Sequence, residues 1–209
     1  MKVCENMHLN KYIEDVSAFY NNNADNYFEK TKNIDMYEAY NKFLQYIPAG
    51  GHILDVGCGS GRDLRYFKNN NYVPEGLDIS KSICKIAEKY SGCKVYNDNI
   101  LTINSSDFDK YDGVWACASL LHIKYTQLPL ALDKISNLLN SNGYVYLSFK
   151  HGNKEYKNNK NLQYTDMSSV KMIVLLAKYK TFKIIEEFYT SDGLAREKDW
   201  YNVILQKRN

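Results

Sequence analysis

From about residue 53 the chain alternates short apolar runs with longer segments whose apolar positions recur every three or four residues. The short runs predict β-strands, and the longer segments predict helices. Strands that alternate with helices build a parallel sheet covered on both faces, because each crossover helix packs back onto the sheet. The expected strands are HILDVG, YVPEGLDI, CKVYN, YDGVWACA and GYVYLSFK.

Three helices are expected between these strands: SGRDLRYFKNN, SKSICKIAEKYSG and QLPLALDKISNLLN. Ser80 is suited to cap the start of the second helix, and Gly92 follows its end. Asn142 and Gly143 are expected to close the third helix.

The two ends of the chain have a different pattern. Residues 1–50 are expected to be mostly helical, with Pro48 opening the joint into the first strand. After residue 150, KHGNKEYKNNKNLQYTD predicts a long loop and SSVKMIVLLAKYK a helix. FKIIEEFYT and WYNVILQK predict two antiparallel strands. A length of 209 residues suits one α/β domain.

The charge is too weak to suggest a partner. The 27 basic and 24 acidic residues leave a net charge of +3 with no block of one sign, which argues for neither nucleic acid nor membrane. The 19 tyrosines are interpreted as a compositional bias of the source genome.

The cysteines and the apolar runs indicate a cytoplasmic protein. Five cysteines without a C-x-x-C pair fit neither a disulfide framework nor a zinc site: Cys4, Cys58, Cys84, Cys93 and Cys117. The first residues carry charges where a signal peptide needs an apolar stretch. The longest apolar run, MIVLLA, is far too short to span a membrane. We expect a soluble, cytoplasmic protein with reduced thiols and no metal.

The segment ILDVGCGSGRD places Gly57, Gly59 and Gly61 behind the first strand. A phosphate-binding P-loop needs G-x-x-x-x-G-K-[ST], and no Lys-Ser or Lys-Thr pair follows this loop. A dinucleotide site needs G-x-G-x-x-G, and Arg62 stands where its third glycine would pack. Both phosphate interpretations are therefore weakened.

The motif LDVGCGSG, with Asp55 inside it and Asp78 at the end of the second strand, resembles the class I S-adenosylmethionine-dependent methyltransferases. The resemblance is strongest over residues 50–150. It implies an α/β, Rossmann-like, seven-stranded, mostly parallel sheet with a C-terminal antiparallel hairpin. It also implies a helical lid over 1–50, a cofactor-binding core over 51–150 and a substrate side over 151–209. The implied cofactor is S-adenosylmethionine, and S-adenosylhomocysteine is the product.

The resemblance assigns the glycine loop to the amino-acid part of the cofactor. Gly57, Cys58 and Gly59 would let the backbone approach the methionine moiety, whose carboxylate would meet the free N–H groups of the next helix. Arg62 either meets this anion or is a solvated surface charge. Asp55 holds either the ammonium of the cofactor or the N–H groups of the loop.

Asp78 would accept hydrogen bonds from two ribose hydroxyls, with Ile79 beside it. The other interpretation, a helix cap, is weaker because Ser80 can cap that helix. After the third strand, the family's adenine site corresponds to Asp98, Asn99 and Ile100, where an acid takes the exocyclic amine and an apolar residue covers the ring.

The fourth strand ends in WACASLLHIK, which would bring Ala116 and Ser119 to the cofactor. His122 is the candidate base, since an imidazole accepts protons near neutral pH, but it could instead only shape the pocket. Lys150 and His151 either face an anionic acceptor or are solvated.

The N-terminal stretch FYNNNADNYFEKT resembles the lid of small-molecule methyltransferases. Tyr20, Tyr27 and Thr31 would contact the cofactor from above, unless the tyrosines only pack on the sheet edge.

The leading function is methyl transfer to an O or N atom of a small or medium-sized metabolite. Base-modifying enzymes often carry Asp/Asn-Pro-Pro-aromatic where this chain has Cys117, Ala118, Ser119 and Leu120. Cys117 also lacks the preceding proline of cytosine C5 enzymes, and a buried apolar role is expected for it. The alternatives are a methyltransferase of tRNA or another nucleic acid, and a non-catalytic cofactor-binding or partner-binding domain.

Overall fold

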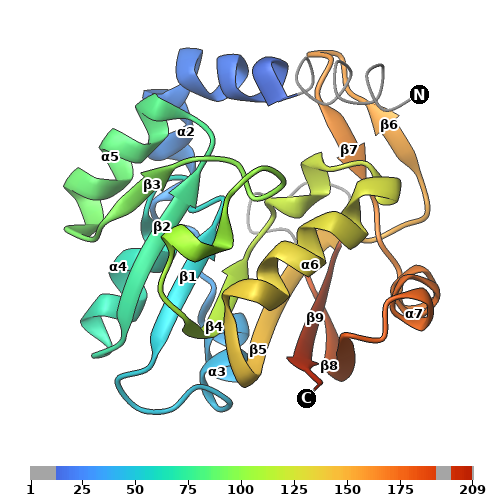
Figure 1. Cartoon of the computed structure of the whole chain (residues 1–209). Helices are drawn as coiled ribbons and strands as arrows, with labels where there is room; N and C mark the ends of the chain where they lie inside the picture. Colours follow the sequence, from blue (N-terminus) through green and yellow to red (C-terminus); the bar gives the residue numbers. More distant parts are fainter. Residues whose placement is uncertain (1–12, 192–198, 209) are drawn as a thin grey trace.

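The computed structural model describes residues 13–191 and 199–208, and it contains a seven-stranded sheet (Figure 1). The strand order is β3-β2-β1-β4-β5-β9-β8, with the first five strands parallel and the last two antiparallel. The strands are β1 (His52–Val56), β2 (Val73–Asp78), β3 (Val95–Asn97), β4 (Tyr111–Ala116), β5 (Leu139–Lys150), β8 (Phe182–Thr190) and β9 (Trp200–Lys207). The expected α/β fold with a terminal antiparallel hairpin is confirmed.

Helices cover both faces of the sheet. They are α2 (Ala24–Thr31), α3 (Tyr37–Leu44), α4 (Arg62–Asn69), α5 (Lys81–Ser91), α6 (Leu128–Leu138) and α7 (Ser169–Lys178). Residues 13–22 are also helical. Short 3-10 turns are η1 (Ser105–Asp107), η2 (Leu120–His122) and η3 (Tyr125–Gln127). The part of the N-terminal prediction that falls on residues 1–12, including Cys4, lies outside the described residues.

Alternation along the strands divides the core into two layers. On β1, Ile53 packs with α3 and α4, whereas Leu54 packs with α6 on the other face. Figure 1 shows α6 on one side of the sheet, with α4 and α5 on the other. The capping predictions for α5 are confirmed, since Ser80 accepts the N–H of Ile83 at 3.2 Å and Gly92 has a φ of +65°.

The prediction for the third core helix was partly wrong. That helix, α6, ends at Leu138 rather than at Asn142, and β5 begins at Leu139. Leu139 pairs with Tyr111 of β4 and is buried, so burial against the sheet overrides the helical pattern of the sequence.

The predicted long loop contains a small hairpin. Strands β6 (Glu155–Lys157) and β7 (Gln163–Thr165) pair in a separate two-stranded sheet. The sequences of these two strands are short and polar and show no clear strand pattern. The hairpin is instead supported by residues that are distant in sequence, since Thr165 Oγ1 donates to the backbone oxygen of Ile123 at 2.7 Å. This hairpin, named the β6–β7 hairpin below, packs against the turn after β4.

Candidate functional site

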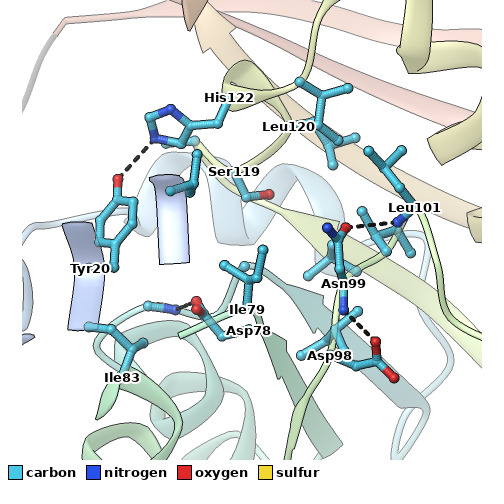
Figure 2. Close-up of a pocket in the computed structure, with 18 of the residues that line it drawn as sticks. Tyr20, Asp78, Ile79, Ile83, Asp98, Asn99, Leu101, Ser119, Leu120 and His122 are labelled. Carbon is cyan, nitrogen blue, oxygen red and sulfur yellow. Dashed lines mark hydrogen bonds between the residues drawn. The ribbon is translucent and has the colours of Figure 1, made fainter. Parts of the chain in front are cut away.

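A cavity lies at the carboxyl ends of β1, β2 and β4 (Figure 2). In open α/β sheets this edge is where ligands bind. The structure brings most of the expected site residues to the cavity wall: Tyr20, Tyr27, Gly57, Gly59, Asp78, Ile79, Asp98, Asn99, Ile100, Ser119 and His122. The other expected residues lie outside this lining: Thr31, Asp55, Cys58, Arg62 and Ala116.

The glycine loop is closely packed against its neighbours. Gly57 has a φ of +73°, and a Cβ placed there would come within 2.3 Å of the Ser119 Cβ atom. A Cβ on Gly59, where φ is +54°, would come within 3.0 Å of the Tyr27 ring. Both positions therefore require glycine for backbone conformation and for space.

Asp78 joins the glycine loop to the end of β2. Its carboxylate accepts the backbone N–H of Gly59 at 3.1 Å and that of Ser80 at 2.9 Å. Burial raises the pKa of Asp78 to about 6, although these hydrogen bonds oppose the shift. Asp78 is therefore a half-buried acceptor at the cavity wall and also a structural link, a second role that the sequence did not reveal.

The segment after β3 forms the far side of the cavity. Figure 2 shows Asp98 and Asn99 on the side opposite Tyr20. The Asp98 carboxylate accepts the N–H of Asn99 at 2.7 Å, and the Asn99 side chain accepts the N–H of Leu101 at 2.9 Å. Ile100 is buried beside them. An apolar surface edged by polar groups suits a flat, heteroatom-rich ring.

Two buried oxygen atoms near the loop have no partner among the described residues. They are the Ser119 Oγ atom, on the cavity wall, and the Asp55 Oδ2 atom, beneath the loop. Burial raises the pKa of Asp55 well above its usual value, with the Asp63 carboxylate adding to the effect. Buried polar atoms are nearly always hydrogen-bonded, so the Ser119 hydroxyl indicates a polar ligand in the cavity.

Asp55, Cys58 and Ala116 are buried wall supports rather than lining residues. Asp55 is 1% exposed, Cys58 is 6% exposed and Ala116 is fully buried. Asp55 belongs to β1, Cys58 to the glycine loop and Ala116 to β4, and the close packing around the loop also covers their side chains. The contact of these three residues with the cofactor stays a prediction.

Arg62 contacts a carboxylate of the chain itself. Its Nε and Nη2 atoms donate to the two oxygen atoms of Asp63 at 2.5 and 2.9 Å. Tyr40 and Trp115 also donate to Asp63, the latter at 2.9 Å. Burial by itself would raise the pKa of Asp63, but Arg62 and these hydrogen bonds lower it. The interpretation of Arg62 as a solvated surface charge was wrong, because its side chain is largely buried against Asp63, while its contact with the carboxylate of the ligand stays a prediction.

Two tyrosines of the N-terminal helices lie over the cavity. The Tyr20 and Tyr27 rings meet edge to face with centroids 5.2 Å apart, and Tyr27 rests on Gly59. Thr31 instead donates to the backbone oxygen of Tyr27 at 2.8 Å, because a threonine in a helix readily bonds to the preceding turn. The contact of Thr31 with the cofactor stays a prediction, although its hydroxyl is bonded within the helix.

The sequence did not reveal how these helices attach to the core. Asn21 Oδ1 accepts the Ser80 hydroxyl and the backbone N–H of Ser82, both at 2.9 Å. Ser17 donates to the backbone oxygen of Ile79 at 3.2 Å. These bonds hold the helical segment 13–22 against the start of α5, and only the third dimension brings them together.

His122 is held at both ring nitrogens. Its Nδ1 atom lies 2.9 Å from the backbone oxygen of Gln163, and its Nε2 atom lies 2.9 Å from the hydroxyl of Tyr20. A carbonyl oxygen only accepts, so Nδ1 carries a proton and Nε2 of the neutral ring accepts from Tyr20. Burial lowers the pKa of His122 to about 4, the Gln163 carbonyl opposes this shift, and Lys150 lowers the pKa further.

Within residues 13–191 and 199–208, no three His, Cys, Asp or Glu side chains gather as a metal site would require. The same residues include no helix long and apolar enough to cross a membrane.

The fold and site together define an α/β protein with a ligand-sized cavity at the carboxyl edge of its sheet, an acidic residue at the end of β2 and a glycine loop after β1. A family model described as a methyltransferase domain matches residues 28–173. The chain belongs to this methyltransferase family, and the resemblance seen in its sequence is confirmed.

Solved structures share the fold at low sequence identity. The Burkholderia thailandensis 1,6-didemethyltoxoflavin-N1-methyltransferase, with bound 1,6-didemethyltoxoflavin and S-adenosylhomocysteine, aligns with a TM-score of 0.81 and 15% identity, over 96% of this chain and 90% of that one. The magnesium protoporphyrin IX methyltransferase of Synechocystis PCC 6803, with bound S-adenosylmethionine, aligns with a TM-score of 0.70 and 14% identity, over 94% and 97%.

Curated relatives match a smaller part. Uncharacterized protein MJ1252 of Methanocaldococcus jannaschii is 30% identical over 131 residues, which is 61% of this chain and 49% of that protein. The O-methyltransferase resE of Aspergillus sclerotiorum is 32% identical over 98 residues, which is 44% of this chain and 36% of that protein. The matches span about half or less of these relatives.

Proposed function

We propose that this protein transfers a methyl group from S-adenosylmethionine to an oxygen or nitrogen atom of a small or medium-sized metabolite. The observation that carries the proposal is the cavity itself, where Asp78 and the glycine loop stand at the carboxyl edge of a methyltransferase sheet. The cofactor found in the Burkholderia and Synechocystis structures supports the choice of ligand.

The residues present fit this cofactor. Asp78 would take the ribose hydroxyls, and Asn99 and Ile100 would border the adenine. Gly57 and Gly59 leave room at the loop, where the unpartnered Ser119 hydroxyl would bond to the methionine part. When bound, S-adenosylmethionine supplies an electrophilic methyl carbon and leaves as S-adenosylhomocysteine with the electron pair of the broken carbon–sulfur bond.

The side chains then have three tasks. They hold the acceptor in line with the methyl group, they exclude water, and they take a proton when the acceptor carries one. Tyr20 and Tyr27 cover the cavity and keep water out. Because burial lowers its pKa to about 4, His122 is neutral at physiological pH but is a weak base, and its unprotonated Nε2 atom would take the proton only as the methyl transfer proceeds.

A small acceptor suits a covered cavity. The weak net charge of +3, with no block of basic residues, favours a small acceptor over a nucleic acid. The Burkholderia enzyme also binds a small molecule, 1,6-didemethyltoxoflavin. A cytoplasmic location is part of the proposal, since the free thiols of Cys58, Cys84, Cys93 and Cys117 suit a reducing compartment.

Two measurements test the proposal. Calorimetry should detect binding of S-adenosylmethionine or S-adenosylhomocysteine and none of NAD or ATP. Labelled methyl groups should then enter the small-molecule fraction of a cell extract, and nuclease treatment should not change the yield. Label that disappears with nuclease would favour the nucleic-acid alternative, and binding without any transfer would favour a non-catalytic domain.

A further inference from the structure

We propose that Tyr20 is a catalytic residue that passes the acceptor's proton to His122, and that the backbone carbonyl of Gln163 is the positioning group that keeps His122 ready to receive it. This inference rests on the proposed function. It goes beyond that function because it assigns Tyr20 to proton transfer rather than to cofactor cover, and it includes a hairpin that the sequence presents as a loop.

The geometry is a chain of two hydrogen bonds. The Tyr20 hydroxyl lies 2.9 Å from His122 Nε2, and His122 Nδ1 lies 2.9 Å from the Gln163 oxygen. Figure 2 shows the first bond between the helical segment 13–22 and the turn after β4, with both side chains on the cavity wall. Two consecutive hydrogen bonds thus join three parts of the chain that are distant in sequence.

The carbonyl of Gln163 determines the direction of transfer. Because this oxygen can only accept, the Nδ1 proton stays in place and the free lone pair of the ring is on Nε2. That lone pair is occupied by the Tyr20 hydroxyl, so a proton can reach Nε2 through the tyrosine oxygen. A phenol oxygen has two lone pairs and can accept one proton while it donates another.

The surroundings hold the imidazole still. The His122 ring lies between the rings of Tyr20 and Tyr164, with centroid distances of 5.8 and 4.8 Å. The Lys150 Nζ atom lies over the Tyr164 ring, 4.3 Å from its centroid. His122 itself is 7% exposed. A ring fixed in this way loses little time to unproductive orientations, which favours transfer.

The transfer balances in protons. The O–H or N–H of the acceptor gives its proton to Tyr20 Oη and keeps the electron pair with which the acceptor attacks the methyl carbon. The original hydroxyl proton of Tyr20 moves to His122 Nε2. Tyr20 therefore ends neutral, and His122 ends as an imidazolium that still donates from Nδ1 to the Gln163 carbonyl.

Tyr20→Phe tests the relay, because it keeps the ring and removes the hydroxyl. The first readout is ¹⁵N NMR of the imidazole in the protein without ligand. In the unsubstituted protein Nδ1 should be protonated, and Nε2 should show the shift of an imine nitrogen that accepts a hydrogen bond. In Tyr20→Phe the Nδ1 proton should remain, while Nε2 should move to the value of an imine nitrogen without a bond. Tyr27→Phe is the matched control, and it should leave the Nε2 resonance in place.

The second readout is turnover. Tyr20→Phe should lower kcat by the roughly 10² to 10⁴ of a lost proton-transfer group, with calorimetric cofactor affinity within about threefold of the original. Unchanged turnover would overturn the relay, and so would a protonated Nε2 in the unsubstituted protein. Failure of the proposed function gives a different result. If the proposed function is wrong, the unsubstituted protein does not bind S-adenosylmethionine or S-adenosylhomocysteine, whereas the NMR readout of the relay requires no ligand.

Discussion

The carboxylate of Asp78 accepts the backbone N–H of Gly59 at 3.1 Å, so the residue proposed for the ribose also fixes the loop proposed for the methionine part. A second backbone N–H, that of Ser80, donates to the same side chain at 2.9 Å. The two halves of the proposed cofactor site therefore depend on each other.

Asp78→Asn should weaken cofactor binding by about 1.5 to 3 kcal/mol for each charged hydrogen bond that is lost. The unliganded variant should be at least as stable as the original at pH 8. The raised pKa of about 6 means that ionised Asp78 destabilises the fold above that pH, and this effect is lost in the amide. Calorimetry and urea unfolding check the two effects separately.

The affinity of the unsubstituted protein should also fall as the pH drops through about 6, because Asp78 then gains a proton. Asp78→Asn should not show this step. An Asp78→Asn protein that unfolds without ligand, or that binds the cofactor normally, would make Asp78 a structural residue.

His122 should make stability depend on pH. Its pKa is about 4 in the folded protein and about 6.5 in the unfolded chain, so the unfolded chain takes up a proton first as the pH falls. The contribution of neutral His122 is fully present above pH 6.5 and is lost progressively toward pH 4, for a total of about 3 kcal/mol. Unfolding by urea at several pH values measures it.

His122→Gln is the control variant for this change of folding stability with pH. Asp78 has a raised pKa and changes stability in the opposite direction over an overlapping range, but it is present in both proteins and cancels in the difference. If the two proteins lose stability equally between pH 6.5 and pH 4, His122 is not held neutral by burial.

Gly57→Ala should destabilise the protein by more than the cost of its positive φ, because the new Cβ would come within 2.3 Å of Ser119. Gly50→Ala is a matched control: φ there is +74°, and a Cβ would meet nothing within 4 Å. We expect about 1 kcal/mol for the control and an added 1 to 3 kcal/mol for the crowded position, measured by urea unfolding. Equal losses would mean that Ser119 moves aside freely.

Arg62→Ala should destabilise the fold by about 3 to 5 kcal/mol, because it leaves the Asp63 carboxylate buried without its cation. Arg65→Ala, one turn along α4, removes an exposed guanidinium 4.6 Å from the Tyr90 ring centroid and should cost about 0.5 to 1 kcal/mol.

Chemical unfolding is measured for Arg62→Ala, for Asp63→Asn and for the double variant. This double-mutant cycle gives the interaction energy between the two side chains, apart from their interactions with other residues. Asp63→Asn should restore part of the folding stability that is lost in Arg62→Ala. A loss of cofactor affinity in Arg62→Ala with unchanged stability would instead favour the interpretation in which Arg62 meets the carboxylate of the ligand.

Local pattern was sufficient for most of the core. The alternation of strands and helices from His52 to Lys150, the Ser80 cap and the glycine after α5 all follow from residue spacing and turn chemistry, which act over a few neighbouring residues. The same short range explains why Gly57, Gly59 and Asp78 could be placed at one edge: parallel strands end on the same side of a sheet.

Partners distant in sequence could not be predicted in this way. The sequence by itself determined the methyltransferase sheet and the glycine loop at the end of its first strand. Only the tertiary structure brought Tyr40 and Trp115 to the carboxylate of Asp63, ended α6 at Leu138 to bury Leu139, and joined Tyr20, His122 and the Gln163 carbonyl. The physical reason is that a buried polar group must find a partner wherever the chain passes, and a linear pattern does not encode which segments become neighbours.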